Sequence, residues 1–197
     1  MKKKQFLAVM LLAQAPLASA ATTGFDNEVD FLAQLNSQYY LEDFSTYTYG
    51  NPFDGGQLNA NYGPVNDYSW TASAPIGLYS NSGALSTASS GDTLTITFTG
   101  NPVTALGGIF ASTDLNGDYI LQTVTVNLSD NTSELLTTGL GFLGFTSAFA
   151  ITSLTIDGVD APDNNWPQLD HFYVGSKIAE IAPVPVPAAV WLFGSGL

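Results

Sequence analysis

Alternation of apolar and polar residues with a period of two is the feature that most constrains the fold of this chain. The clearest case is Thr93–Thr99, where Leu94, Ile96 and Phe98 fall on one face and threonines on the other. Apolar residues at 124, 126 and 128 repeat the pattern, and Gly, Asn, Asp and Pro separate the short runs. The pattern predicts an all-β chain folded as an antiparallel sandwich, not alternating strands and helices.

Shorter strands are expected at four other places, which are Tyr39–Phe44, Asp67–Thr71, Val103–Ser112 and Leu169–Val174. In Ser147–Ile156 the parity of the apolar residues changes, because Phe149 and Ile151 share one face and Leu154 falls on the other. This predicts a β-bulge or a bend between sheets near Thr152–Ser153. The glycines spaced through 139–145 favour a turn or a close approach of another segment to the backbone.

One short helix is expected at Asp26–Asn36, near the start of the domain. Asn27 is suited to cap it, and acidic residues crowd the first turn, where the helix dipole favours them. Apolar residues at helical spacing predict a buried stripe, formed by Val29, Phe31, Leu32 and Leu35.

Residues 1–20 have the layout of a secretory signal peptide, with three lysines, an apolar run and a small-residue cleavage site. One domain is then expected at 21–178. After removal of 1–20, Lys177 is the one basic residue against 17 acidic residues, a formal charge of −16. A chain without a basic groove is a poor partner for nucleic acid, whereas divalent cations and neutral glycans remain good candidates.

The chain has no cysteine and one histidine, His171. Disulfides, thiolate metal sites and multi-histidine metal sites are therefore excluded. An exported domain of this kind depends on its core, and a hard cation such as a structural Ca²⁺, bound by carboxylates, is a candidate for additional support.

The end of the chain, 184–197, reads Val-Pro-Val-Pro-Ala-Ala-Val-Trp-Leu-Phe-Gly-Ser-Gly-Leu. It closely resembles the start of the PEP-CTERM sorting signal, Val-Pro-x-Pro-Ala-Ala-x-Trp-Leu-Phe-Gly-Ser-Gly. The matching residues are Val184, Pro185, Val186, Pro187, Ala188, Ala189, Trp191, Leu192, Phe193 and Gly194. Val186 stands where the family usually has Glu, and the basic tail of the family is absent.

This resemblance implies an exported protein of a Gram-negative bacterium, processed by an exosortase-type enzyme and often produced alongside exopolysaccharide. It places the protein in the periplasm, on the outer-membrane surface or in the extracellular matrix, with transient membrane association through the C-terminal segment. Residues 179–187 are then a Pro-rich linker, and 188–197 begin the sorting or transmembrane segment. Spanning a bilayer takes about 20 apolar residues, so we expect a segment truncated at Leu197. The alternative is a last core strand, which the prolines disfavour.

The domain is also similar to the jelly-roll sandwiches that precede such signals, through the order of four segments, of which the first is its helix. The segments are Val29–Leu35, Leu41–Phe44, Gly141–Ser147 and Leu169–Gly175. This likeness implies a jelly-roll-like antiparallel β-sandwich with one short N-terminal helix, and no particular activity.

Asp114-Leu-Asn-Gly-Asp118 presents oxygen ligands at alternate positions, so Asp114, Asn116 and Asp118 are candidate Ca²⁺ ligands. The same Asn-Gly sequence is equally typical of a plain hairpin turn. Glu42 with Asp43, or Asp170, could instead complete a structural calcium site.

Seven of the nine tyrosines lie between Tyr39 and Tyr79, in a stretch rich in Asn and Gly. Exposed aromatic side chains flanked by amides form sugar-stacking platforms, which makes Trp70, Tyr68 and Tyr79 candidate glycan-binding residues. The alternative is that these aromatic residues fill the core.

Asp170 and His171 are adjacent, and neighbouring strand residues point to opposite faces, so we do not expect Asp170 to orient His171 as a catalytic triad requires. No catalytic residue is assigned. The sequence predicts a non-enzymatic, glycan- or matrix-contacting module. A polysaccharide-active hydrolase and a purely structural matrix protein are the alternatives.

Overall fold

The computed structural model describes residues 22–46, 57–80, 83–158 and 165–179. The expected signal peptide at 1–20 and the sorting motif at 184–197 lie outside the described residues, as does the expected linker beyond Ala179. The statements made above about these segments therefore stay predictions.

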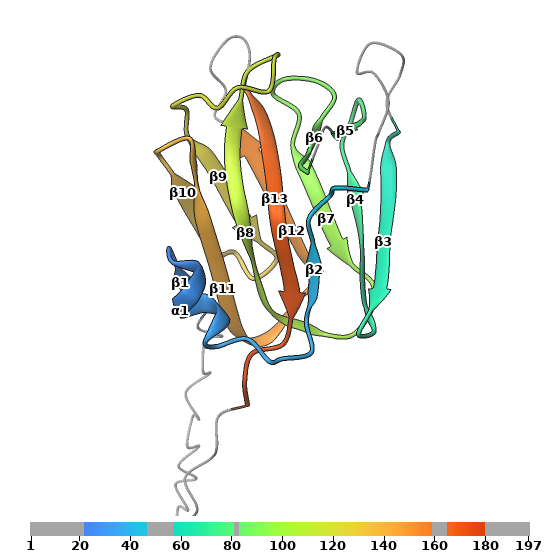
Figure 1. The fold of residues 1–197 in the computed structure, drawn as a ribbon, viewed down its shortest axis with the longest axis vertical. Helices are drawn as coiled ribbons and strands as arrows, with labels where there is room; N and C mark the ends of the chain where they lie inside the picture. Colours follow the sequence, from blue (N-terminus) through green and yellow to red (C-terminus); the bar gives the residue numbers. More distant parts are fainter. Residues whose placement is uncertain (1–21, 47–56, 81–82, 159–164, 180–197) are drawn as a thin grey trace, which may run out of the picture.

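The described residues form two antiparallel sheets and one short helix, which confirms the predicted all-β sandwich (Figure 1). The seven-stranded sheet has the order β1 (Thr23–Phe25), β11 (Leu140–Ile151), β8 (Val103–Thr113), β13 (Trp166–Gly175), β6 (Leu85–Thr87) and β5 (Leu78–Ser80), and β2 (Tyr40–Glu42) also pairs with β13. The six-stranded sheet has the order β10 (Ser133–Leu136), β9 (Val124–Leu128), β12 (Ser153–Gly158), β7 (Leu94–Phe98), β4 (Tyr68–Ser73) and β3 (Asn59–Val65).

The predicted alternation fills the space between the two sheets. Leu94 and Ile96 of β7 are fully buried, and so are Val124 and Val126 of β9. The facing sheet contributes a matching set to the same core, which includes Leu106, Phe110, Phe145, Leu169, Phe172 and Val174. Each such side chain contributes about 1.5–3 kcal/mol by leaving water, so this core is the main source of stability.

The predicted bend at Thr152–Ser153 is a switch between sheets. Strand β11 belongs to the seven-stranded sheet and ends at Ile151, whereas β12 begins at Ser153 and belongs to the six-stranded sheet. The expectation that Phe149 and Ile151 share a face is wrong, because Phe149 is 59% exposed and Ile151 is buried. The pairing of β11 with β8 shifts register between Thr146 and Ile151, and this irregularity breaks the alternation.

Helix α1 spans Glu28–Leu32, and Asn27 is its N-cap as predicted. The Asn27 side chain accepts hydrogen bonds from the backbone N–H groups of Val29 and Asp30, at 2.9 and 3.2 Å. The helix is shorter than the predicted range, which extended to Asn36. The five-residue helix depends on its cap and on packing against the sheet, because a helix this short is not stable alone.

The predicted apolar stripe of α1 is correct in part. Phe31 and Leu35 are buried, and they pack with Ala105 and Tyr173 on the outer face of the seven-stranded sheet. Val29 is 73% exposed, so its assignment to the buried stripe was wrong. One turn of helix presents a narrow face to a sheet, and Phe31 occupies it.

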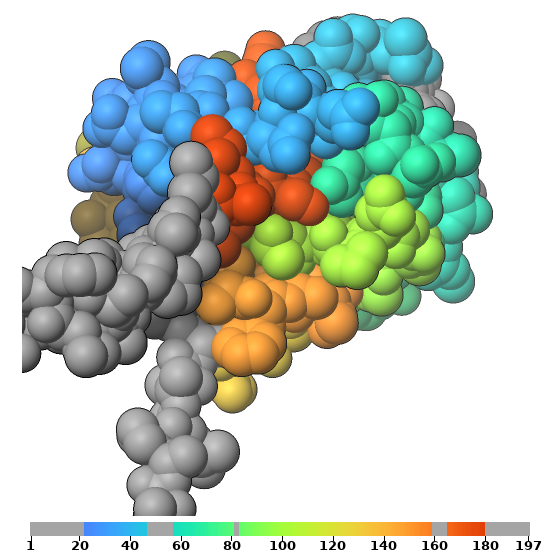
Figure 2. All heavy atoms as spheres, turned by 90° about the horizontal axis from the view of Figure 1, so that it is seen from below, coloured from blue at the N-terminus to red at the C-terminus, as the bar shows by residue number. Residues whose placement is uncertain are grey.

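Both ends of the described chain lie at the lower end of the sandwich in Figure 1. The segment after β13 is held beside α1, because Asn36 N–H donates to the Ser176 carbonyl and Ile178 N–H donates to the Gln34 carbonyl, each at 2.8 Å. Seen from below, the N-terminal segment and the end of β13 lie next to each other on the surface (Figure 2). The chain therefore enters and leaves the sandwich at one end.

Candidate functional site

The structure contradicts the prediction that Trp70 and Tyr68 form an exposed sugar-stacking platform. Both lie on the inward-facing positions of β4, and they are 1% and 6% exposed. The Trp70 ring stacks on Tyr62 with the ring centroids 3.8 Å apart, and Phe172 meets it edge-on at 5.3 Å. The alternative interpretation, in which these aromatic residues fill the core, is correct for Trp70 and Tyr68.

Tyr79 does not belong to this buried cluster. In β5 the neighbours Leu78 and Ser80 are buried, and Tyr79 between them is half-buried and points outward. Among the three predicted glycan-binding residues, Tyr79 is the one on a solvent-facing surface.

A row of outward-facing residues crosses the sheet from Tyr79. Its members are direct partners in the strand registers, in the order Tyr79, Ser86, Gln168, Ala111 and Leu140. Residues directly opposite one another in a sheet share a face, so these five side chains lie on the outer face of the seven-stranded sheet.

Trp166 joins the same face from the start of β13. It is two residues before Gln168, so both side chains point outward, while Pro167 and Leu169 are buried. Trp166 is half-buried, and its backbone partner on β8 is Thr113. The sequence analysis missed Trp166 because it began this strand at Leu169; extending the alternation upstream would have found it.

We call Tyr79, Ser86, Trp166 and Gln168 the outer aromatic face. The Ser86 hydroxyl is buried and donates to the Pro167 carbonyl at 2.9 Å, so it stabilises the pairing of β6 with β13. Within the described part of the chain, the Tyr79 hydroxyl, the Trp166 indole N–H and the Gln168 amide make no hydrogen bond, and neither ring contacts another aromatic ring. These groups are available to a ligand.

The spacing of the two rings follows from sheet geometry. Tyr79 and Gln168 are two strands apart, and strands are separated by about 4.8 Å, which places their backbones about 10 Å apart. Trp166 lies a further two residues along β13. Two ring surfaces with an amide on the same face can stack on an extended ligand and hydrogen-bond to it.

The turn with the predicted calcium ligands lies next to Trp166, because it continues β8 beyond Thr113. Asp114 Oδ1 accepts the backbone N–H groups of Asn116 and Asp118, at 2.8 and 3.0 Å, and Gly117 adopts a left-handed φ of +85°. The Asp118 amide is the main cause that lowers the pKa of Asp114 below its ordinary 3.8, and the Asn116 amide adds to it. The carboxylate therefore stabilises the turn itself.

Calcium binding at this turn stays a prediction. Among the described residues, no group of three or more His, Asp or Glu side chains is arranged to hold a metal ion. Of the other candidates, Glu42 is buried and has both oxygens engaged, since Oε2 accepts from the Tyr40 hydroxyl at 2.6 Å and Oε1 from Phe44 N–H at 2.9 Å.

The expectation that Asp170 does not orient His171 is wrong. His171 has a φ of +46°, and the β13–β8 register shifts between Asp170 and Tyr173, so the two side chains do not point to opposite faces. Asp170 Oδ1 lies 2.8 Å from His171 Nδ1 and also accepts the His171 backbone N–H at 2.6 Å. A bulge has placed an aspartate and the single histidine in contact.

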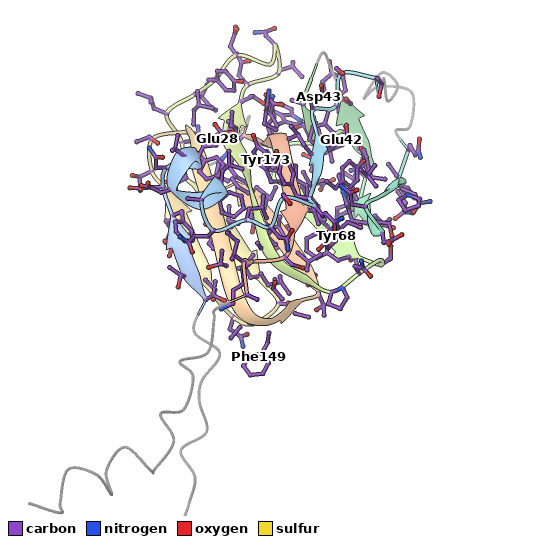
Figure 3. The ribbon with its side chains drawn as sticks, turned by 60° about the horizontal axis from the view of Figure 1, so that its bottom comes forward. Glu28, Glu42, Asp43, Tyr68, Phe149 and Tyr173 are labelled. Carbon is purple, nitrogen blue, oxygen red and sulfur yellow. The ribbon has the colours of Figure 1, made fainter. Side chains whose placement is uncertain are left out.

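Asp43 lies close to this pair, because it follows Glu42, the last residue of β2, which pairs with Phe172 of β13. Figure 3 shows Asp43 next to Glu42. Hydrogen bonds from the Ser45 hydroxyl, at 2.7 Å, and from the Ser45 backbone lower the pKa of Asp43, and the charge on His171 lowers it further. The Ser45 hydroxyl thus bonds to Asp43, and in the described chain no serine hydroxyl bonds to the His171 ring. The cluster has an acid and a base without an activated nucleophile.

In comparisons with known proteins, neither a family model nor a curated protein sequence matches the chain. The site is therefore argued from geometry and chemistry. Within the described residues, no helix has the length and apolar character needed to cross a membrane.

Proposed function

We propose that this protein is an exported, non-enzymatic module of the bacterial cell envelope or extracellular matrix that holds glycan on its outer aromatic face. The observation that carries the proposal is the outward-facing set of Tyr79, Trp166 and Gln168. Half-buried rings with unpaired polar groups are suited to the flat apolar faces and hydroxyl edges of sugar rings. The rings keep low mobility because strands hold them.

The sorting part of the proposal rests on the sequence at both ends of the chain. The residues at 184–197 resemble a PEP-CTERM signal, and those at 1–20 resemble a signal peptide. The fold supports this order of segments, since the described chain leaves the sandwich beside α1, whereas Trp166 and the Asp114–Asp118 turn lie at the other end (Figure 1). If the C-terminal segment is attached to the envelope, the outer aromatic face lies toward the end of the sandwich that is far from the attachment.

Sorting is tested in a Gram-negative host that has an exosortase. The full-length gene is compared with a variant in which Trp191 and Phe193 are replaced by Asp. We expect the wild-type chain to be processed after export, and the variant to stay unprocessed. Identical processing of both chains would contradict the sorting proposal.

Glycan contact is tested by affinity electrophoresis and calorimetry of the exported chain with exopolysaccharide from such a host. We expect saturable binding with no change in polymer length. Chain shortening or release of reducing ends would instead support the hydrolase alternative. If the polymer is neither bound nor cleaved, the remaining interpretation is a purely structural matrix protein.

One observation favours the hydrolase as a second candidate, namely the Asp170–His171 pair with Asp43 beside it. An imidazole held by a carboxylate can act as a general base on water or on a sugar hydroxyl. If His171 acts as such a general base, replacing it by Ala abolishes cleavage in the reducing-end assay. A chain that binds polymer equally well with and without His171, and cleaves none, would remove this candidate.

A further inference from the structure

The surroundings of the outer aromatic face are acidic on two sides. At one side, Trp166 pairs with Thr113, and the turn with Asp114 and Asp118 follows directly. At the other side, Asp170 is the next outward residue of β13 after Gln168. A ligand stacked on the two rings therefore lies between two groups of carboxylates.

Positive charge that could offset these carboxylates is scarce. Lys177 is the one basic residue after position 4. Its backbone forms an isolated β-bridge with Leu35 beside α1, at the far end of the sandwich. His171 is the nearest group that can become cationic, and it is already paired with Asp170 and close to Asp43. The field over the face is negative, and a chain of formal charge −16 after removal of 1–20 reinforces it.

The shape of the face constrains the ligand as well. Tyr79 and Trp166 stand on strands separated by β6, so a molecule that touches both rings must cross β5, β6 and β13. The backbones of Tyr79 and Trp166 are more than about 10 Å apart, because Trp166 lies two residues along β13 from Gln168, and a single sugar ring does not reach from one aromatic side chain to the other. The Gln168 amide, on the same face of β13 as Trp166 and level with Tyr79, supplies a donor and an acceptor for hydroxyl groups.

We infer that the outer aromatic face selects uncharged glycan chains, which stack on Tyr79 and Trp166 and hydrogen-bond to Gln168, and rejects polyanionic glycans through Asp118 and Asp170. This inference rests on the proposed function and adds its substrate class. Uronate, sulfate or phosphate groups on the same polymer would lie within the repulsive range of the carboxylates. Stacking and hydroxyl contacts carry no such cost for a neutral polymer.

The test compares matched polymers. Neutral glucans, mannans and galactans are each measured beside their own carboxymethylated derivatives, using the full exported chain at low salt. We expect the neutral polymer to bind about tenfold or more tightly than its charged derivative. In about 1 M salt the difference should shrink, since the screening length falls to about 3 Å.

Variants locate the effect. Trp166→Ala and Tyr79→Ala should each weaken neutral binding about tenfold. Phe149→Ala is the matched control, because Phe149 is an exposed ring at the lower end of the sandwich, away from Asp43 and Glu42 (Figure 3). Asp118→Asn and Asp170→Asn should improve binding of the carboxymethylated polymer more than binding of the neutral polymer. Circular dichroism and melting temperature confirm that each variant is folded.

The outcomes separate the two proposals. Neutral and charged polymers that bind equally, or tighter binding of the charged one, would overturn the selectivity and leave glycan binding intact. Binding that survives the folded double variant Tyr79→Ala/Trp166→Ala would overturn the site. Absence of binding to any neutral polymer would overturn the proposed function together with the inference.

Discussion

The outer face of the seven-stranded sheet has two halves that differ in what lies on them. The lower half is covered by α1, whose Phe31 is fully buried against Ala105 and Tyr173. The upper half carries Tyr79 and Trp166, which stay half-buried and meet no other aromatic ring in the described chain. The same strands β8 and β13 run through both halves, so the difference comes from side chains and not from the sheet.

Glycine explains where the helix lies. Gly107 and Gly144 are direct partners in the β11–β8 register, under Phe31. A Cβ added at Gly144 would stand 2.6 Å from the Phe31 ring, and one at Gly175 would stand 2.9 Å from Leu35. The missing side chains give the helix its place close to the sheet, as the glycine spacing in 139–145 suggested.

Polar contacts then fix the covered half. The Tyr173 hydroxyl donates to Glu28 Oε1 in α1 (Figure 3). The pKa of Tyr173 is raised, first by burial of the hydroxyl and second by its hydrogen bond to this carboxylate. In the upper half, the corresponding polar groups of Trp166 and Gln168 have no partner among the described residues. The comparison teaches that one half of the face is covered by the chain's own helix, whereas the other keeps polar groups without a partner in the described chain, and it is there that we propose a glycan binds.

The largest expected loss of stability comes from removing the Phe31 ring, which packs α1 onto the lower half of the face. Phe31→Ala should destabilise the protein by about 3–5 kcal/mol, because it empties a fully buried site. Trp166→Ala in the open half should cost about 1 kcal/mol or less. Urea denaturation of both variants measures the contrast, and equal losses would mean that Trp166 is a core residue.

Filling the space under the helix should have the next largest effect. Gly144→Ala places a methyl group against the Phe31 ring and should cost about 1–3 kcal/mol through overpacking. Gly117→Ala is an unsuitable control because Gly117 has a positive φ, whereas Gly24→Ala meets its nearest atom at 3.5 Å and should change stability little. A Gly144→Ala variant as stable as Gly24→Ala would show that α1 is not held closely.

Loss of the helix cap should be smaller. Asn27→Ala removes the acceptor for the N–H groups of Val29 and Asp30 and should cost about 1 kcal/mol. Asn27→Ser restores an acceptor and should recover most of that loss. Denaturation midpoints of the three chains decide the matter; an alanine variant with wild-type stability would show that packing alone holds the helix.

The smallest effect on stability concerns the Asp114–Asp118 turn beside the upper half of the face, and it depends on pH. The pKa of Asp114 is lowered from 3.8, so its ionised form is favoured in the folded state. The stability it contributes is present above that value and is lost as pH falls through the lowered pKa. Melting temperatures of wild type and Asp114→Asn should differ at neutral pH and converge in strong acid; a constant difference would contradict this role.

The period-two alternation carried enough information to predict the sandwich, the strands at Leu94–Phe98 and Val124–Leu128, and the bend at Thr152. Asn27 was predictable as a cap because its cause is local, a side chain bonding to its own helix. Val29 was assigned wrongly because helical spacing does not say which side of a short helix meets a sheet.

Trp70 and Trp166 show the limit most clearly. Both are tryptophans in strands, each preceded by a polar residue, and the difference between them is which face of which sheet they occupy. The Asp170–His171 contact was missed for a related reason, since a bulge cancels the rule that neighbouring strand residues point apart.

By itself, the sequence determined the fold class, the helix cap, the sheet-switching bend and the strong negative charge, because each follows from local pattern or composition. Tertiary structure alone decided that Trp70 belongs to the core, that Tyr79 and Trp166 share an outer face, and that Asp170 holds His171. These depend on strand order and register, which join residues far apart in the chain and leave no local trace in the sequence.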